Sequence, residues 1–105
     1  MFGIGRKVVI RIRSTVPRSA VEEATRQIEG LKDRRIKAEL DGRYLYIYAS
    51  GDPLCRFKYE DSDSVWRFAL YRYSRGGYSN DVCPYPSSNR IDAGIRVALD
   101  IYNMG

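Results

Sequence analysis

The feature that most constrains the fold is a run of strict alternation that begins at Tyr44. From there the chain reads Tyr-Leu-Tyr-Ile-Tyr-Ala, so tyrosine occupies every second position. Successive side chains of a β-strand point to opposite faces, whereas a helix would mix the two kinds on its surface. The run therefore predicts a strand with one tyrosine face and one apolar face.

A second alternating segment, residues 36–40, precedes this strand and is separated from it by Asp41 and Gly42. Asp-Gly between two such segments is a strong β-hairpin signal, because a type I′ turn needs positive φ angles at both central positions. With these two residues as the loop, we expect Leu40 to lie opposite Arg43. The hairpin then sorts apolar side chains to one face and tyrosines to the other.

Alternation also predicts three further strands, at residues 7–14, 54–60 and 65–74. The segment 75–88 is rich in glycine and proline and predicts a loop, with enough residues to contain a short extra strand. The Arg75-Gly-Gly-Tyr sequence within it resembles the tripeptides of RNA-binding tails and equally suits a turn at the end of a strand.

Two segments have apolar side chains at the three- and four-residue spacing of an amphipathic helix. The first runs to about Asp33, and the spacing of Ser19 and Glu22 predicts a capping box at its start. The second begins after Ser88 or Asn89, either of which would serve as the N-cap, and continues to the end of the chain.

The resulting order is β-α-β-β-β-β-α, which predicts a single two-layer α+β domain over residues 1–105. Its mainly antiparallel sheet has both helices packed on one face. The apolar face that the helices would cover consists of Val8, Ile10, Ile12, Ile36, Ala38, Leu45, Ile47, Phe57, Trp66 and Phe68.

Composition excludes much enzyme chemistry. The chain has no histidine, and its two cysteines, Cys55 and Cys83, form no CxxC pair, so a His/Cys metal site and a histidine base are both ruled out. We expect no catalytic residues, no cofactor and no metal. We expect two free thiols, with Cys55 as a small core residue, and a disulfide between them is the alternative.

No stretch approaches the ~20 apolar residues that span a bilayer, and the first residues lack the apolar region of an export signal. These observations predict a cytoplasmic protein without a membrane partner, and the length of 105 residues suits a monomer or small oligomer. The net charge of +5 favours an acidic partner.

The uncovered face of the sheet is the candidate binding surface. It combines basic and tyrosine side chains, with Glu39 as the one acid placed among them; the candidate residues are Arg11, Arg13, Lys37, Tyr44, Tyr46, Tyr48, Arg56, Lys58, Arg67, Tyr71 and Tyr73. Tyrosine rings stack on unpaired bases, with ~1–3 kcal/mol per base in known systems, while arginine contacts phosphates. This face predicts non-enzymatic binding of single-stranded RNA, or of single-stranded DNA.

Three other readings of the sequence remain open. The same face suits a protein interface with an acidic partner, since tyrosine and arginine are enriched at binding hot spots. Tyrosine is also a good strand former, so a solvated sheet without a ligand fits the pattern. A small-molecule cavity among Trp66, Phe68 and Tyr102 is disfavoured, because a chain of this length needs such side chains to fill its core.

Overall fold

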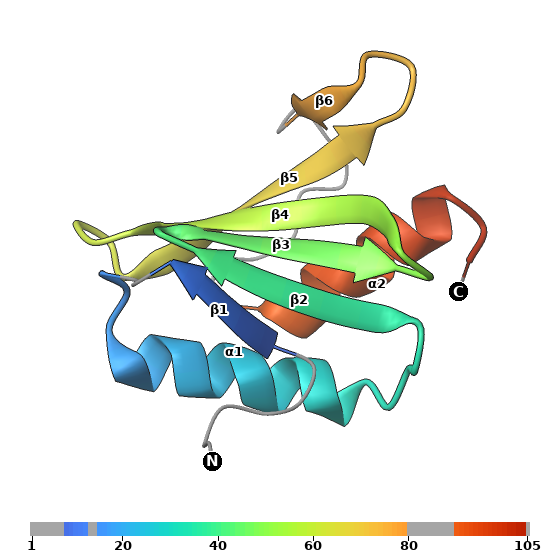
Figure 1. Cartoon of the computed structure of the whole chain (residues 1–105). Helices are drawn as coiled ribbons and strands as arrows, with labels where there is room; N and C mark the ends of the chain where they lie inside the picture. The colour runs from blue at the N-terminus through green and yellow to red at the C-terminus, as the bar shows by residue number, and fades with distance from the viewer. Residues whose placement is uncertain (1–7, 13–14, 80–89, 105) are drawn as a thin grey trace.

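Six strands form one sheet whose order in space, β1-β2-β3-β4-β5-β6, follows the order of the chain (Figure 1). The computed structural model describes residues 8–12, 15–79 and 90–104, with the backbone alone for residues 8–12. The strands are β1 (Val8–Ile12), β2 (Ile36–Asp41), β3 (Tyr44–Ala49), β4 (Asp52–Glu60), β5 (Val65–Arg72) and β6 (Gly77–Ser79), and the helices are α1 (Arg18–Gly30) and α2 (Ile91–Ile101).

The predicted fold class is confirmed: the domain is α+β, with a mainly antiparallel sheet and both helices on one side of it (Figure 1). Among the described strands the one parallel pair is β1 with β2, which α1 connects by crossing over the covered face. The short extra strand for which the 75–88 segment had room is β6, which pairs antiparallel with the end of β5.

The core lies between the sheet and the two helices. Every side chain predicted for the apolar face that the structure describes is buried: Ile36, Ala38, Leu45, Ile47, Phe57, Trp66 and Phe68. The predicted helix stripes meet them with Val21, Ala24 and Ile28 from α1 and Ile91, Ile95 and Ala98 from α2. For Val8, Ile10 and Ile12 the structure describes the backbone alone, and this backbone pairs with β2.

Gly94 brings α2 unusually close to the sheet. A Cβ atom built at this position would lie 2.7 Å from Cζ and 2.8 Å from Cε2 of Phe57, and 3.0 Å from Cδ1 of Phe68. The two phenylalanine rings pack against each other with centroids 5.6 Å apart. The helix backbone therefore rests on these rings, and only glycine leaves room for that contact.

The hairpin between β2 and β3 forms, but its turn lies one residue later than predicted. Asp41 pairs with Tyr44 and Leu40 with Leu45, so the expected pairing of Leu40 with Arg43 was wrong. Gly42 has a φ of 63° and Arg43 is not among the residues with positive φ, the pattern of a type II′ turn, which needs glycine only at its first central position. The paired residues shift by an even number, so both faces keep the predicted side chains.

The predicted capping box at the start of α1 was also wrong. Pro17 is the N-cap, and its carbonyl accepts hydrogen bonds from the backbone N–H groups of Ala20 and Val21 at 3.0 and 3.1 Å. Ser19 lies inside the first turn, and Glu22 instead accepts a hydrogen bond from Nε of Arg18 at 3.1 Å. The helix ends at Gly30, before the predicted Asp33, and the proposed caps of α2, Ser88 and Asn89, lie outside the described residues.

Candidate functional site

The face of the sheet opposite the helices carries the predicted tyrosines. Tyr46 lies opposite Arg56, and Arg56 opposite Ala69, so these positions on β3, β4 and β5 share one face. Beyond Ala69, β5 continues into β6, and Figure 1 shows this β5–β6 arm rising from the sheet on the side away from the helices. The β5–β6 arm therefore forms a boundary at one end of the open face. The alternating pattern of the sequence did not predict this boundary.

The tyrosine rings form a continuous series rather than separate platforms. Successive ring centroids lie 5.9, 5.8, 5.0, 4.8 and 5.7 Å apart along the tyrosine row, which consists of Tyr44, Tyr46, Tyr78, Tyr71, Tyr73 and Tyr102. The contact between Tyr46 and Tyr78 joins β3 to β6 across two intervening strands. The twist of the sheet and the small side chain of Ala69 leave room for it. The tyrosine row therefore lines the open face and also holds the β5–β6 arm against β3.

Arg56 occupies the centre of this arrangement. Its guanidinium carbon lies 4.6 Å from the centroid of the Tyr44 ring and 4.7 Å from that of the Tyr78 ring. Each contact is a cation–π interaction, worth ~0.5–1 kcal/mol at a partly exposed site. Among the described residues no carboxylate forms an ion pair with Arg56. The guanidinium thus lies close to two rings and still has N–H groups to donate.

Tyr78 is the main site residue that sequence reasoning missed. Burial raises the pKa of its hydroxyl above the ordinary tyrosine value, and the neighbouring Tyr48 and Tyr46 hydroxyls raise it further. The Arg75-Gly-Gly segment before it is the turn between β5 and β6, where the N–H of Gly76 donates to the carbonyl of Arg72 at 2.8 Å. The segment that resembles an RNA-binding tripeptide therefore forms a turn at the end of a strand, as the other interpretation of this sequence predicted.

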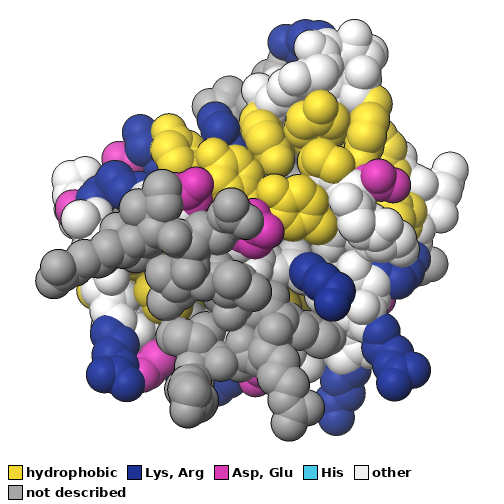
Figure 2. All heavy atoms as spheres, viewed as in Figure 1, with side chains coloured by type: hydrophobic (Ala, Val, Ile, Leu, Met, Phe, Trp, Pro, Cys, Tyr) yellow, Lys and Arg dark blue, Asp and Glu magenta, His cyan; other side chains and the backbone are white. Residues whose placement is uncertain are grey.

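The charges on the open face are more balanced than predicted. Lys58 pairs with Glu60 at 3.6 Å, and Arg67 pairs with Asp63 at 2.7 Å. Besides Glu39, the alternation places Asp41 and Glu60 on the same face as the basic residues. Figure 2 shows a band of hydrophobic side chains, with tyrosine counted among them, bordered by both basic and acidic groups.

The remaining predicted site residues lie in three different settings. Lys37 is exposed on β2 opposite the half-buried Tyr48, and both lie on the open face. Tyr73 is 53% exposed and lies next to Tyr102, the last residue of the row and the C-cap of α2, so it faces a different part of the surface. Arg11 belongs to β1, whose side chains the structure does not describe, and Arg13 lies outside the described residues.

The described residues contain no cluster of three or more His, Cys, Asp or Glu side chains placed to hold a metal ion. Cys55 is a free, fully buried thiol whose pKa is raised by burial, and Cys83 lies outside the described residues. Neither described helix is long and apolar enough to cross a membrane. The chemistry offered by the open face is therefore that of aromatic rings, one guanidinium held among them, and surrounding ion pairs.

Fold and face together define a small α+β protein with an open, tyrosine-rich sheet. Comparison of the chain with protein-family models, curated proteins and solved structures found no match. The residues of the open face are therefore the guide to its function.

Proposed function

We propose that this protein is a non-enzymatic binding domain that takes single-stranded nucleic acid, RNA first, on its open face. The observation that supports this proposal is the position of Arg56 between the rings of Tyr44 and Tyr78. Single-stranded bases stack on aromatic rings and on arginine planes, and a guanidinium without a carboxylate partner donates well to phosphate. The arrangement offers both kinds of contact in one place.

The Arg56 side chain is also preorganised for binding. Arg56 would lose ~2 kcal/mol of side-chain conformational freedom if it were ordered only on binding, but its two ring contacts hold it in the free protein. Tyr44 ends the tyrosine row and is half-buried, so part of its ring remains available to a ligand. A base stacked there would lie next to the guanidinium, and its phosphate would lie within reach of Lys58 on the adjacent strand.

The test is fluorescence anisotropy of labelled single-stranded RNA and DNA at two salt concentrations, with matched arginine variants. We expect Arg56→Ala to weaken binding about tenfold and to reduce the salt slope by about one. Arg96→Ala, which removes an equal charge from the exposed side of α2, should change neither. Absence of binding at low salt, or equal losses in both variants, would overturn the proposal.

The balance of charges on the face favours a second candidate, a protein partner. Lys58 and Arg67 already have carboxylate partners, which weakens attraction to phosphates, while tyrosine and arginine remain typical of protein hot spots. If oligonucleotides fail to bind at low salt, affinity capture with the wild type, Arg56→Ala and Arg96→Ala as baits tests this candidate. A partner lost only with Arg56→Ala would support it.

A further inference from the structure

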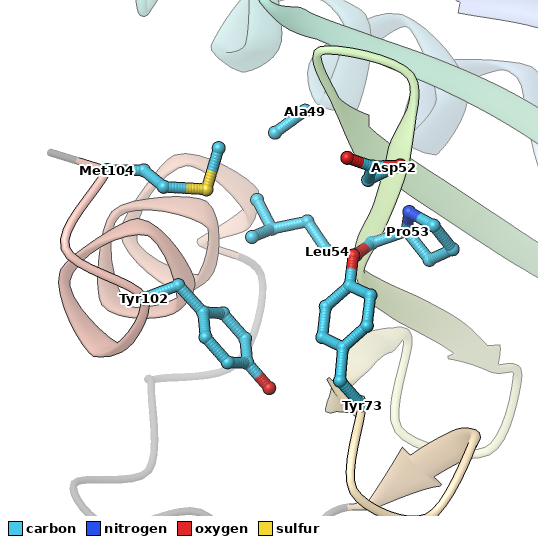
Figure 3. A pocket seen from close by; sticks show the side chains of 7 residues that line it. All are labelled: Ala49, Asp52, Pro53, Leu54, Tyr73, Tyr102 and Met104. Carbon is cyan, nitrogen blue, oxygen red and sulfur yellow. The ribbon is translucent and has the colours of Figure 1, made fainter.

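A pocket of ≈ 220 Å³ lies outside the open face, between the start of β4 and the C-terminal end of α2 (Figure 3). Its lining is mostly apolar and aromatic, and the side chains come from four parts of the chain: Ala49, Asp52, Pro53, Leu54, Tyr73, Tyr102 and Met104. The volume falls below the ~300 Å³ at which sites for whole drug-sized molecules begin. The pocket therefore suits a single chemical group rather than a large ligand.

Two perpendicular tyrosine rings form walls of this pocket. The planes of Tyr73 and Tyr102 meet at 85°, with centroids 5.7 Å apart. Each ring is fixed by its hydroxyl, because Tyr73 donates a hydrogen bond to the carbonyl of Pro53 and Tyr102 donates one to the carbonyl of Tyr71. Neither ring has to be ordered when a ligand enters. In Figure 3 both rings border the space below Leu54.

Two features of the pocket favour a cation, on a chain whose net charge is +5. The Asp52 side chain lies at the rim, exposed, and forms no ion pair with a described residue. The C-terminal end of α2 contributes the negative end of the helix dipole, and the last turn of that helix contains no basic residue to offset it. Burial, with the Asp52 carboxylate adding to it, raises the pKa of the Tyr73 hydroxyl.

The described cation–π contacts of this protein involve Tyr44 and Tyr78, and none involves Tyr73 or Tyr102. Both residues line the pocket, so a cation that enters it would meet these two rings. A hydrated ammonium gains little from the apolar lining of Leu54 and Met104, whereas an N-methylated ammonium spreads its charge over methyl groups that pack against such side chains and against rings.

We propose that this pocket binds a methylated ammonium group, held by the ring faces of Tyr73 and Tyr102 and neutralised by the Asp52 carboxylate. This inference does not rest on the proposed nucleic-acid function, because the pocket and the open face are different surfaces. Two kinds of molecule carry such a group, a small molecule of the choline type and a protein with a trimethylated lysine side chain.

The test is titration of the isotopically labelled full chain with choline chloride at constant ionic strength, followed by amide chemical shifts. The matched probe is dimethylbutanol, the neutral carbon isostere of choline, which has the same shape without the charge. We expect saturable shifts around Asp52 and Tyr73 with choline and at least about fivefold weaker binding of the isostere. Equal binding of both probes, or of neither, would overturn the proposal.

Substitutions separate ring, hydroxyl and charge. Tyr73→Leu should weaken choline binding at least about fivefold, while Tyr73→Phe keeps the ring, loses the hydrogen bond that fixes it, and should weaken binding less than Tyr73→Leu. Asp52→Asn should cost about two- to fivefold, and Asp63→Asn, on the distant β4–β5 turn, should cost nothing. Choline affinity that is unchanged in Tyr73→Leu would contradict the assignment, and Asp52→Asn keeps it testable if Tyr73→Leu does not fold.

A final arm identifies the source of the group. Nα-acetyl-trimethyllysine amide is titrated in the same way as choline, with the unmethylated amide as its control. Tighter binding of the trimethylated amide than of choline would assign the pocket to a modified lysine side chain. Equal binding would assign it to the ammonium group alone, and a preference for the unmethylated amide would overturn the proposal.

Discussion

The sheet of this protein has an aromatic cluster on each face, and the two are held together in different ways. On the covered face Phe57 and Phe68 are fully enclosed and are pressed by the backbone of α2 at Gly94. On the open face the rings of the tyrosine row contact one another and the guanidinium of Arg56, and they are half-buried at Tyr44, Tyr46, Tyr71 and Tyr78. The covered cluster depends on exclusion of every extra atom, whereas the open one keeps polar groups at its surface and tolerates exchange with water.

The sharpest way to test this difference is at Gly94. Gly94→Ala should destabilise the fold by about 1–3 kcal/mol, because the new methyl group overlaps the rings of Phe57 and Phe68 and the clash exceeds the gain in helix propensity. The measurement is urea unfolding. Gly30→Ala is the matched control, since a Cβ there meets nothing within 4 Å, and it should be neutral or slightly stabilising. Equal effects at the two glycines would refute the close contact.

On the open face the largest effect is expected from Tyr78→Ala. Loss of its contacts with Tyr46 and Tyr71 should cost about 1–2 kcal/mol and should free the β5–β6 arm. Hydrogen exchange will locate the change: amide protection should fall at Tyr78 and Ser79 and persist in β3. If amide protection falls equally throughout the sheet, the tyrosine row stabilises the whole fold and does not act locally on the β5–β6 arm.

Alkaline pH should lower the stability of the fold through a group on each face, the buried Cys55 thiol on the covered face and the Tyr78 hydroxyl on the open face. The raised pKa of Tyr78 means that the folded protein holds this proton more tightly than the unfolded chain. Stability from this group is therefore complete below the unfolded tyrosine pKa of about 10 and declines as pH rises above it, by up to ~1.4 kcal/mol per pH unit. Tyr78→Phe should remove this share of the decline. An unchanged slope of unfolding free energy against pH would contradict the buried environment of Tyr78.

The smallest effect is expected at Ser19. Its hydroxyl caps nothing, since Pro17 is the N-cap and Ser19 lies exposed in the first turn of α1. Ser19→Ala should therefore change stability by less than about 0.5 kcal/mol, in the stabilising direction that the helix propensity of alanine implies. Thermal unfolding is sufficient to check it. A loss near 1 kcal/mol would restore the capping box that the spacing of Ser19 and Glu22 had predicted.

Local patterns predicted the elements and the two faces, because alternation and helical spacing are properties of neighbouring residues. The turn at Gly42 was misplaced because Asp-Gly suits more than one turn type, and the choice depends on the pairing that forms around it. Strand β6 has three residues, too few to show alternation. The contact of Tyr78 with Tyr46 arises from the curl of the whole sheet, and Tyr102 reads as a core position of a helix although its ring meets Tyr73.

The shortness of β6 has a consequence for how copies of this protein meet at high concentration. An edge strand with free backbone groups is a template on which a second chain extends the sheet, the first step of many aggregation routes. Here the β6 edge spans three residues and stands out of the plane of the strands before it. A neighbouring strand would find few backbone partners there and no flat surface to continue, so this edge is protected by its geometry.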